Sequence, residues 1–251
     1  MDEIPTVQTT ETSLEIIRVL KTLGGATLSR VSRELEVSKS TARTHLQTLR
    51  KHEYVVMDDD GAFRLSLEFF DTGERVRSRI PIYEPAIPIV DELAEKTNEK
   101  AQIMVLENTS GYYIYRMKGR QGVSTRAGRQ AELHCTSAGK AILAFTDRDR
   151  VREILNEHGL PERTDRTITD REAFIDTLNQ IRERGFAVND EERLRGLRAV
   201  GAPILDEDDT VLGAISLSGP TTHLRGDRFR EELPELVIQS ADVIHIRTEY
   251  S

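Results

Sequence analysis

The chain has 251 residues, of which 37% are hydrophobic and 31% are charged, and its net charge is −8. This length suits two domains, and the apolar content is sufficient to form a core. No apolar run approaches the ~20 residues that cross a bilayer, and residues 1–12 are polar, unlike a secretory signal. We therefore expect a protein of the cytoplasm with no membrane partner, and its single cysteine, Cys135, excludes an intrachain disulfide.

The charged residues are unevenly distributed along the chain. Residues 29–52 carry six basic side chains against two acidic ones, which predicts a local positive surface on an acidic protein. Seven of the 35 basic residues are Lys, and the sequence contains no Trp. An acidic chain poor in Lys suits a salt-rich cytoplasm, so our hypothesis for its source is a halophilic archaeon.

Three helices are predicted near the N-terminus. Thr12-Ser13-Leu14-Glu15 has the form of a capping box that would open the first helix. Gly24-Gly25 would end this helix. A second helix is expected from about Thr27, and Ser38 can cap a third helix that runs to about Lys51.

A hairpin is predicted after the third helix. Two short apolar segments, 54–57 and 62–65, flank the turn Asp58-Asp59-Asp60-Gly61, which is typical of two antiparallel strands. Three helices and a trailing hairpin form a winged helix-turn-helix, which we assign to residues 1–67. Because the acidic turn would repel phosphate, we expect Arg64 to be the one DNA contact of the wing.

The third predicted helix has two different faces. Ala42, Leu46 and Leu49 recur at helical spacing and are expected to pack inward. The opposite face presents groups that can bind base edges, since Arg suits guanine and Gln suits adenine. Any solvated helix has a polar face, but the turn, the inward Ala42, the basic charge and the wing together favour double-stranded DNA as a partner. The predicted DNA-binding residues are Lys39, Ser40, Thr41, Arg43, Thr44, Gln47, Arg50, Lys51 and Arg64.

The remainder of the chain has an α+β pattern. A helix is predicted from Glu68 to Arg79, and the prolines at 81, 85 and 88 then mark a boundary. We assign residues 68–82 to a linker helix and residues 83–251 to a C-terminal α/β domain. Its predicted helices are residues 89–96, 137–145, 147–158, 170–184 and 229–247, and its predicted strands are residues 101–106, 112–117, 199–205 and 211–217.

Several segments of this second half resemble the IclR family of transcriptional regulators. They are residues 128–145 with the run Glu-Leu-His-Cys-Thr-Ser-Ala-Gly-Lys, Thr167-Ile168-Thr169, residues 182–196, Ala202-Pro203 and residues 216–220. Lys39-Ser40-Thr41 matches the family as well. The resemblance implies a GAF-like domain that binds a small effector, often an organic acid. It also implies homodimers joined through their DNA-binding domains, which often pair into homotetramers, so we expect a homodimer or a homotetramer.

The resemblance also implies which residues bind the effector. They are Ser137, Ala138, Gly139, Asn189, Leu197, Ala199, Ser216 and Ser218. Small residues at a helix start let a carboxylate approach the N-terminus, where the dipole favours an anion. The family often has Asp where this chain has Asn189 and Cys where it has Ala199. Losing the Asp removes a negative charge, so we expect an anion to bind more easily.

Two other groups of residues suggest catalytic or metal chemistry. His134-Cys135 lacks the paired ligands of a zinc site, and a hydrolase site of Ser137 and His134 lacks a nucleophile elbow and a triad. Asp190, Glu191 and Glu192 are adjacent carboxylates that cannot all face one substrate. We therefore predict no catalytic residue, metal or cofactor, and an effector-controlled regulator that is not an enzyme. Two alternatives stay open: a constitutive or architectural DNA-binding protein whose second domain only oligomerises, and an enzyme fused to a DNA-binding domain.

Overall fold

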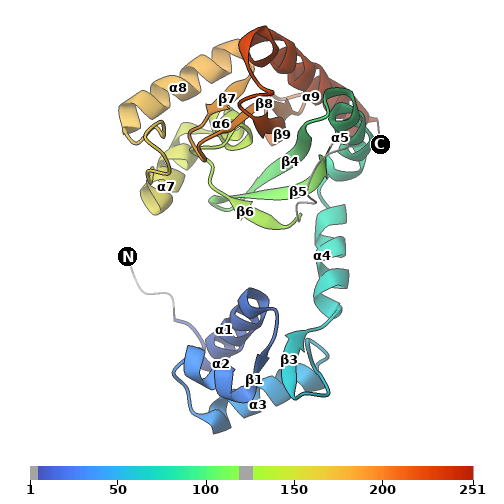
Figure 1. Cartoon of the computed structure of the whole chain (residues 1–251), viewed down its shortest axis with the longest axis vertical. Helices are drawn as coiled ribbons and strands as arrows, with labels where there is room; N and C mark the ends of the chain where they lie inside the picture. Colours follow the sequence, from blue (N-terminus) through green and yellow to red (C-terminus); the bar gives the residue numbers. More distant parts are fainter. Residues whose placement is uncertain (1–4, 119–126, 251) are drawn as a thin grey trace. The chain divides into compact units, whose positions relative to one another are not determined.

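The computed structural model describes residues 5–118 and 127–250 of the chain. These residues form two compact units, Met1–Arg77 and Ser78–Ser251 (Figure 1). The division falls inside the segment 68–82 that we assigned to a linker. Within the described ranges, no helix is long and apolar enough to cross a membrane.

The first unit contains three helices and a small sheet. The helices are α1 (Gln8–Leu23), α2 (Leu28–Glu34) and α3 (Lys39–Lys51), and the strands are β1 (Ala26–Thr27), β2 (Val55–Met57) and β3 (Ala62–Leu65), followed by helix α4 (Glu68–Ser78). The antiparallel sheet has the order β1-β3-β2. Ala42 and Leu46 of α3 are fully buried against Ile16 and Leu20 of α1 in one apolar cluster. The predicted winged helix-turn-helix is thus observed.

Of the two predicted helix caps, the one of α3 is observed and the one of α1 is not. Ser38 accepts the Thr41 N–H at 3.0 Å, so the predicted cap of α3 is confirmed. The capping box of α1 is wrong, because Thr12 and Ser13 lie inside the helix and donate their hydroxyls to the carbonyls of Gln8 and Thr9. The apolar stripe fixes only the buried face of α1, and the polar residues before it extend the helix into solvent.

The second unit is a six-stranded sheet with helices on both faces. Its helices are α5 (Tyr83–Thr97), α6 (Ser137–Phe145), α7 (Arg148–His158), α8 (Arg171–Arg184) and α9 (Leu233–Glu249), with the π-helix η1 (Arg228–Glu232) before α9. Its strands are β4 (Lys100–Glu107), β5 (Ser110–Lys118), β6 (Arg129–Ala131), β7 (Ala187–Asp190), β8 (Leu197–Leu205) and β9 (Val211–Pro220), in the order β6-β5-β4-β9-β8-β7. Strands β6 and β7 are too short to show an alternating pattern and were not predicted.

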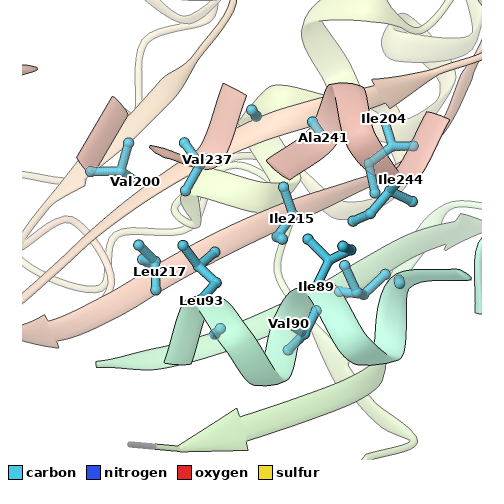
Figure 2. Packing of buried hydrophobic residues seen from close by; sticks show 14 of the residues in the cluster. Ile89, Val90, Leu93, Val200, Ile204, Ile215, Leu217, Val237, Ala241 and Ile244 are labelled. Atoms are coloured by element: carbon cyan, nitrogen blue, oxygen red, sulfur yellow. The ribbon is translucent and has the colours of Figure 1, made fainter. Parts of the chain in front are cut away.

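Helices α5 and α9 cover one face of this sheet. Figure 2 shows Ile89 and Leu93 of α5 packed with Ile215 and Leu217 of β9 and with Ile244 of α9 in one apolar layer. Helix α5 begins well before the predicted residue 89 and holds Pro88 inside it. The burial of its apolar stripe outweighs the one backbone hydrogen bond that a proline removes.

Helix α6 lies on the other face and starts in very close contact with strand β8. Every residue from Ser137 to Ala144 is buried. A Cβ at Gly201 would lie 3.0 Å from the Ala138 nitrogen, and a Cβ at Gly139 would lie 2.3 Å from the Leu133 oxygen. Glycine at 201 therefore lets the N-terminus of α6 approach strand β8, and glycine at 139 lets the helix pack against the segment that precedes it.

Candidate functional site

The predicted DNA-reading residues of α3 all lie on the protein surface. Lys39, Ser40, Thr41, Arg43, Thr44, Gln47, Arg50 and Lys51 are exposed. The hydroxyl of Thr44 donates to the Ser40 carbonyl at 3.1 Å, so part of this face is engaged within the helix. Within the described part of the chain, Arg43 and Gln47 have no hydrogen bond or ion pair through their side chains. These two side chains are therefore free to bind a partner.

The wing is electrostatically different from α3. Arg64 of β3 forms an ion pair with Asp58 at 2.6 Å, and its side chain is 56% exposed. Asp59 and Asp60 at the tip are exposed as well. A DNA contact by Arg64 would have to replace Asp58, whereas Arg43 needs no such exchange.

A second candidate site lies where the N-terminus of α6 meets strands β4, β5, β7, β8 and β9. A cavity of about 40 Å³ is lined there by Lys100, Gln102, Tyr113, Arg116, Thr136, Ser137, Asn189, Arg193, Leu197, Ala199 and Ser218. Five of the predicted effector residues thus border one cavity. The other three, Ala138, Gly139 and Ser216, are buried beside it without lining it.

A chain of hydrogen bonds through Gln102 connects residues that line this cavity or lie beside it. Gln102 of β4 donates to the hydroxyls of Ser216 and Ser218 at 3.4 Å each. Its carbonyl oxygen accepts the Arg116 Nε–H at 3.0 Å. Gln102 therefore connects the predicted serines to a cation that the sequence did not single out.

The charges that face the cavity are all positive. Its described lining contains three cations, Lys100, Arg116 and Arg193, and no carboxylate. Burial is the main cause that lowers the pKa of Lys100 and of Arg116, and the neighbouring cations lower both further. The Arg116 guanidinium lies 3.9 Å from the centre of the Tyr113 ring. Such a cluster of like charges favours an anion, which would relieve the repulsion.

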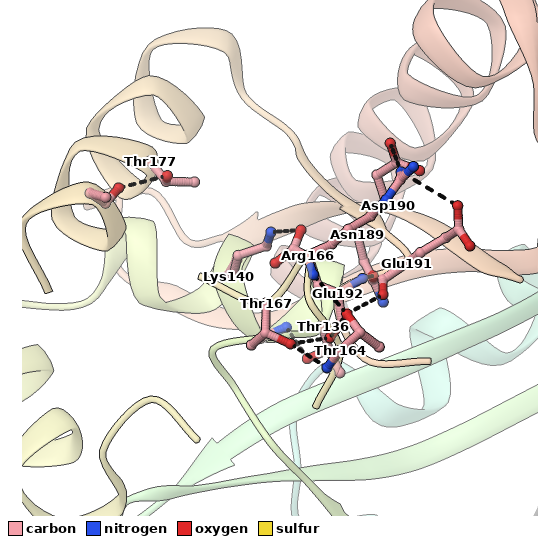
Figure 3. A network of polar contacts seen from close by, with 12 residues as sticks. Thr136, Lys140, Thr164, Arg166, Thr167, Thr177, Asn189, Asp190, Glu191 and Glu192 are labelled. Carbon is pink, nitrogen blue, oxygen red and sulfur yellow. Dashed lines mark hydrogen bonds and ion pairs between the residues drawn. The ribbon is translucent and has the colours of Figure 1, made fainter. Parts of the chain in front are cut away.

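The loop that carries Arg193 is anchored by a buried ion pair. Lys140 of α6 contacts Glu192, and their side chains are 2% and 9% exposed (Figure 3). The Thr167 hydroxyl donates to the Glu192 carbonyl at 2.6 Å, and Asn189 accepts the Glu192 N–H at 2.9 Å. The contacts of Glu192 therefore fix where Arg193 enters the cavity wall.

The ion pair between Lys140 and Glu192 was not predicted from the sequence, although the composition of α6 indicates that one partner is charged and buried. Lys140 is the one charged residue in the apolar helix segment Ser137–Phe145. Burial lowers its pKa, and Glu192 opposes that shift. Charge inside an apolar helix predicts a buried partner, but the sequence does not identify which acid supplies it.

His134 and Cys135 hold structural positions. The His134 ring lies 2.9 Å from the Pro161 carbonyl oxygen. Burial raises the pKa of the Cys135 thiol to about 12. Across residues 5–118 and 127–250, no three His, Cys, Asp or Glu side chains gather as metal ligands do.

Together, a winged helix-turn-helix with exposed polar and basic side chains on α3 and an α/β domain with a cationic cavity indicate a two-domain DNA-binding regulator. Residues 10–59 match the IclR helix-turn-helix domain, and residues 74–246 match the domain described as bacterial transcriptional regulator IclR C-terminal. The chain belongs to the IclR family of transcriptional regulators. The predicted family and fold class are therefore confirmed.

Individual relatives agree with this assignment. The chain is 31% identical over 242 residues to the probable HTH-type transcriptional regulator ArcR of Halobacterium salinarum, covering 94% of this chain and 92% of ArcR. The crystal structure of Thermotoga maritima IclR is similar with a TM-score of 0.81 and 26% identity, covering 97% of this chain and 99% of that one. An IclR homologue from Microbacterium hydrocarbonoxydans, crystallised with 4-hydroxybenzoate, shares the fold with a TM-score of 0.82 at 22% identity, covering 97% and 98%.

Proposed function

We propose that this chain controls transcription from a specific operator and that a small carboxylate changes its affinity for that operator. The cavity at the start of α6 carries the proposal, because three cations and no carboxylate face it among the described residues. A half-buried cluster of like charges is costly for the free protein and gains energy when an anion binds.

On the DNA side, we assign base reading to the outer face of α3. Arg43 and Gln47 would enter the major groove beside Ser40 and Thr44, where Arg suits guanine and Gln suits adenine. Phosphate contacts would come from Lys39, Thr41, Arg50 and Lys51, with Arg64 as a weaker contact because Asp58 already binds it. Residues 1–67 would form the reading domain, residues 68–82 the linker, and residues 83–251 the effector domain.

On the effector side, the carboxylate would lie at the N-terminus of α6. Ser137 and Ser218 can donate hydrogen bonds to it, and Lys100 and Arg116 supply opposite charge. A cavity of about 40 Å³ holds about three water molecules. A larger acid would have to displace the Arg116 or Arg193 side chain. The homologue crystallised with 4-hydroxybenzoate is a relative whose ligand is an organic acid.

We further propose that the chain forms homodimers through its DNA-binding units. Leu14 and Leu23 of α1 are 48% and 41% exposed, and Phe70 of α4 is 67% exposed. Contiguous exposed apolar patches mark protein–protein contacts, and these side chains would contribute to one between two copies. Pairs of dimers would form tetramers, and sedimentation of the free protein measures both states.

We also propose that the regulator acts in the cytoplasm, turns over no metabolite and needs no metal or cofactor. The alternative of a constitutive DNA-binding protein predicts that its operator affinity ignores every small acid.

A thermal-shift series tests the effector class. Acetate, pyruvate and succinate should stabilise the protein by about 2.7 kcal/mol when the acid is present at a hundred times its Kd, and their uncharged amides should not. Arg116→Ala should abolish the effect. The matched control is Arg225→Ala, because Arg225 is exposed and does not line this cavity. If no acid stabilises the protein, or both variants lose the effect equally, the proposed site is wrong.

A further inference from the structure

A second and much larger cavity lies on the same side of the sheet as α6. Its volume is about 450 Å³, and it lies between the β5–β6 edge, α6, α7 and the segment after α7. It is lined by Thr109, Ser110, Arg129, Gln130, Ala131, Glu132, Leu133, His134, Leu143, Ile154, Leu155, His158, Gly159, Pro161, Arg163 and Arg193. Small-molecule sites usually span ~300–1,000 Å³, so this cavity is large enough for an organic ligand.

Part of the lining is apolar. Leu133, Leu143, Ile154 and Leu155 are each no more than 5% exposed and come from three different segments. Because they belong to the core cluster under α6 and α7, their positions are fixed by packing. This wall would take up a hydrocarbon or aromatic body.

The polar groups of the wall are largely satisfied by the protein. The His158 ring lies 3.0 Å from the Thr109 hydroxyl. Arg163 binds Glu132 through its Nε at 2.7 Å, so these two charges cancel. Burial lowers the pKa of His134, which keeps its ring neutral at pH 7. These groups therefore contribute little net charge to the cavity.

Two arginines remain without a counterion. Within the described residues, neither the Arg129 nor the Arg193 side chain has a hydrogen bond or an ion pair, and Arg193 is half-buried. Arg129 is exposed, whereas Arg193 is partly removed from water without a partner, which is costly. A carboxylate can accept two N–H groups of a guanidinium at once. The cavity therefore combines an apolar wall with two unpaired cations.

We propose that this cavity is a second ligand site, which binds an organic acid with an apolar body. Arg129 and Arg193 hold the carboxylate, and the body lies against Leu143, Ile154 and Leu155. The site differs from the effector cavity in its volume, its apolar wall and its own cation, Arg129. Arg193 borders both cavities, so it contributes to both sites.

Nuclear magnetic resonance and calorimetry with 4-fluorobenzoate test this site. The ring should give nuclear Overhauser effects to the methyl groups of Ile154 and Leu155. Removing one charge-assisted contact in Arg129→Ala should weaken this binding about tenfold or more. Arg116→Ala should leave it unchanged, and Arg193→Ala should weaken it too. Arg129 and Arg225 are both exposed, so Arg225→Ala serves as the matched control.

Ligand analogues separate the two halves of the proposal. The uncharged 4-fluorobenzamide and acetate, which lacks the apolar body, should each bind the cavity at least about tenfold more weakly than 4-fluorobenzoate. The proposal is overturned if neither 4-fluorobenzoate nor octanoate binds at millimolar concentration. It is also overturned if 4-fluorobenzoate binds without nuclear Overhauser effects to Ile154 and Leu155, or if Arg116→Ala is the only variant that removes binding.

Discussion

Replacing Glu192 by Gln should destabilise the effector domain strongly, although it changes the shape of one buried side chain very little. Lys140, with 2% of its side chain exposed, would keep its charge and lose its counterion. Removing one partner of a buried ion pair costs about 3–5 kcal/mol. Because the Gln carbonyl can still accept a hydrogen bond from Lys140, we expect the lower end of this range.

Removing both charges should cost much less. Apolar residues of similar volume often replace a buried ion pair at little or no net cost. Lys140→Met combined with Glu192→Leu should therefore be more stable than Glu192→Gln alone. The control is Glu153→Gln, which breaks the exposed pair between Arg150 and Glu153 and should change stability by less than about 0.5 kcal/mol.

The defect of Glu192→Gln should depend on pH with a defined sign. The folded-state pKa of Lys140 lies below its ordinary value of 10.5 even with Glu192 present. At a pH between the folded-state pKa of Lys140 and 10.5, the unfolded chain binds a proton that the folded chain has released, so the free energy of unfolding rises with pH. Urea unfolding at pH 7 and near pH 10 measures the recovery. A variant as stable as the wild type at pH 7, or a defect that grows with pH, would refute this reasoning.

Three further predictions concern DNA, the effector and the cysteine. Arg43→Ala should remove sequence preference, with a loss of about 1–3 kcal/mol of binding free energy on the cognate site, whereas Lys51→Ala should weaken binding evenly across sequences. Fluorescence anisotropy with cognate and random duplexes distinguishes the two effects. Equal losses on both duplexes in both variants would contradict the assignment. Asn189→Asp keeps the acceptor for Glu192 but adds a negative charge, so calorimetry should show acid affinity falling about tenfold or more; unchanged affinity would place the anion elsewhere. Cys135, with a pKa of about 12, should resist iodoacetamide in the native protein, and rapid labelling would show that it is accessible.

Much of the fold could be predicted from local patterns. The Ser38 cap, the helix over Ser137–Phe145 and the hairpin after α3 follow from capping chemistry and hydrophobic spacing. The start of α5 could not be predicted, because Pro85 and Pro88 look like helix breakers until burial against the sheet is known. Short strands such as β6 and β7 carry too few residues for a period to appear.

The candidate effector cavity was predicted only in part. Motifs indicated Ser137, Asn189 and Ser218, which line it. Lys100 and Arg116 could not be recognised, because they face the cavity only when β5 and β4 pair beside β9 in the sheet. Gln102 and Ser218 are 116 residues apart in sequence but in contact, so no local pattern records that they meet.

The most direct measurement is footprinting of the promoter beside the gene for this chain, at one stated salt concentration, with and without an acid that stabilises the protein. We predict a protected site that the acid strengthens or removes in the wild type and leaves unchanged in Arg116→Ala. Protection that is the same with and without every acid that binds would contradict effector control and favour the constitutive alternative.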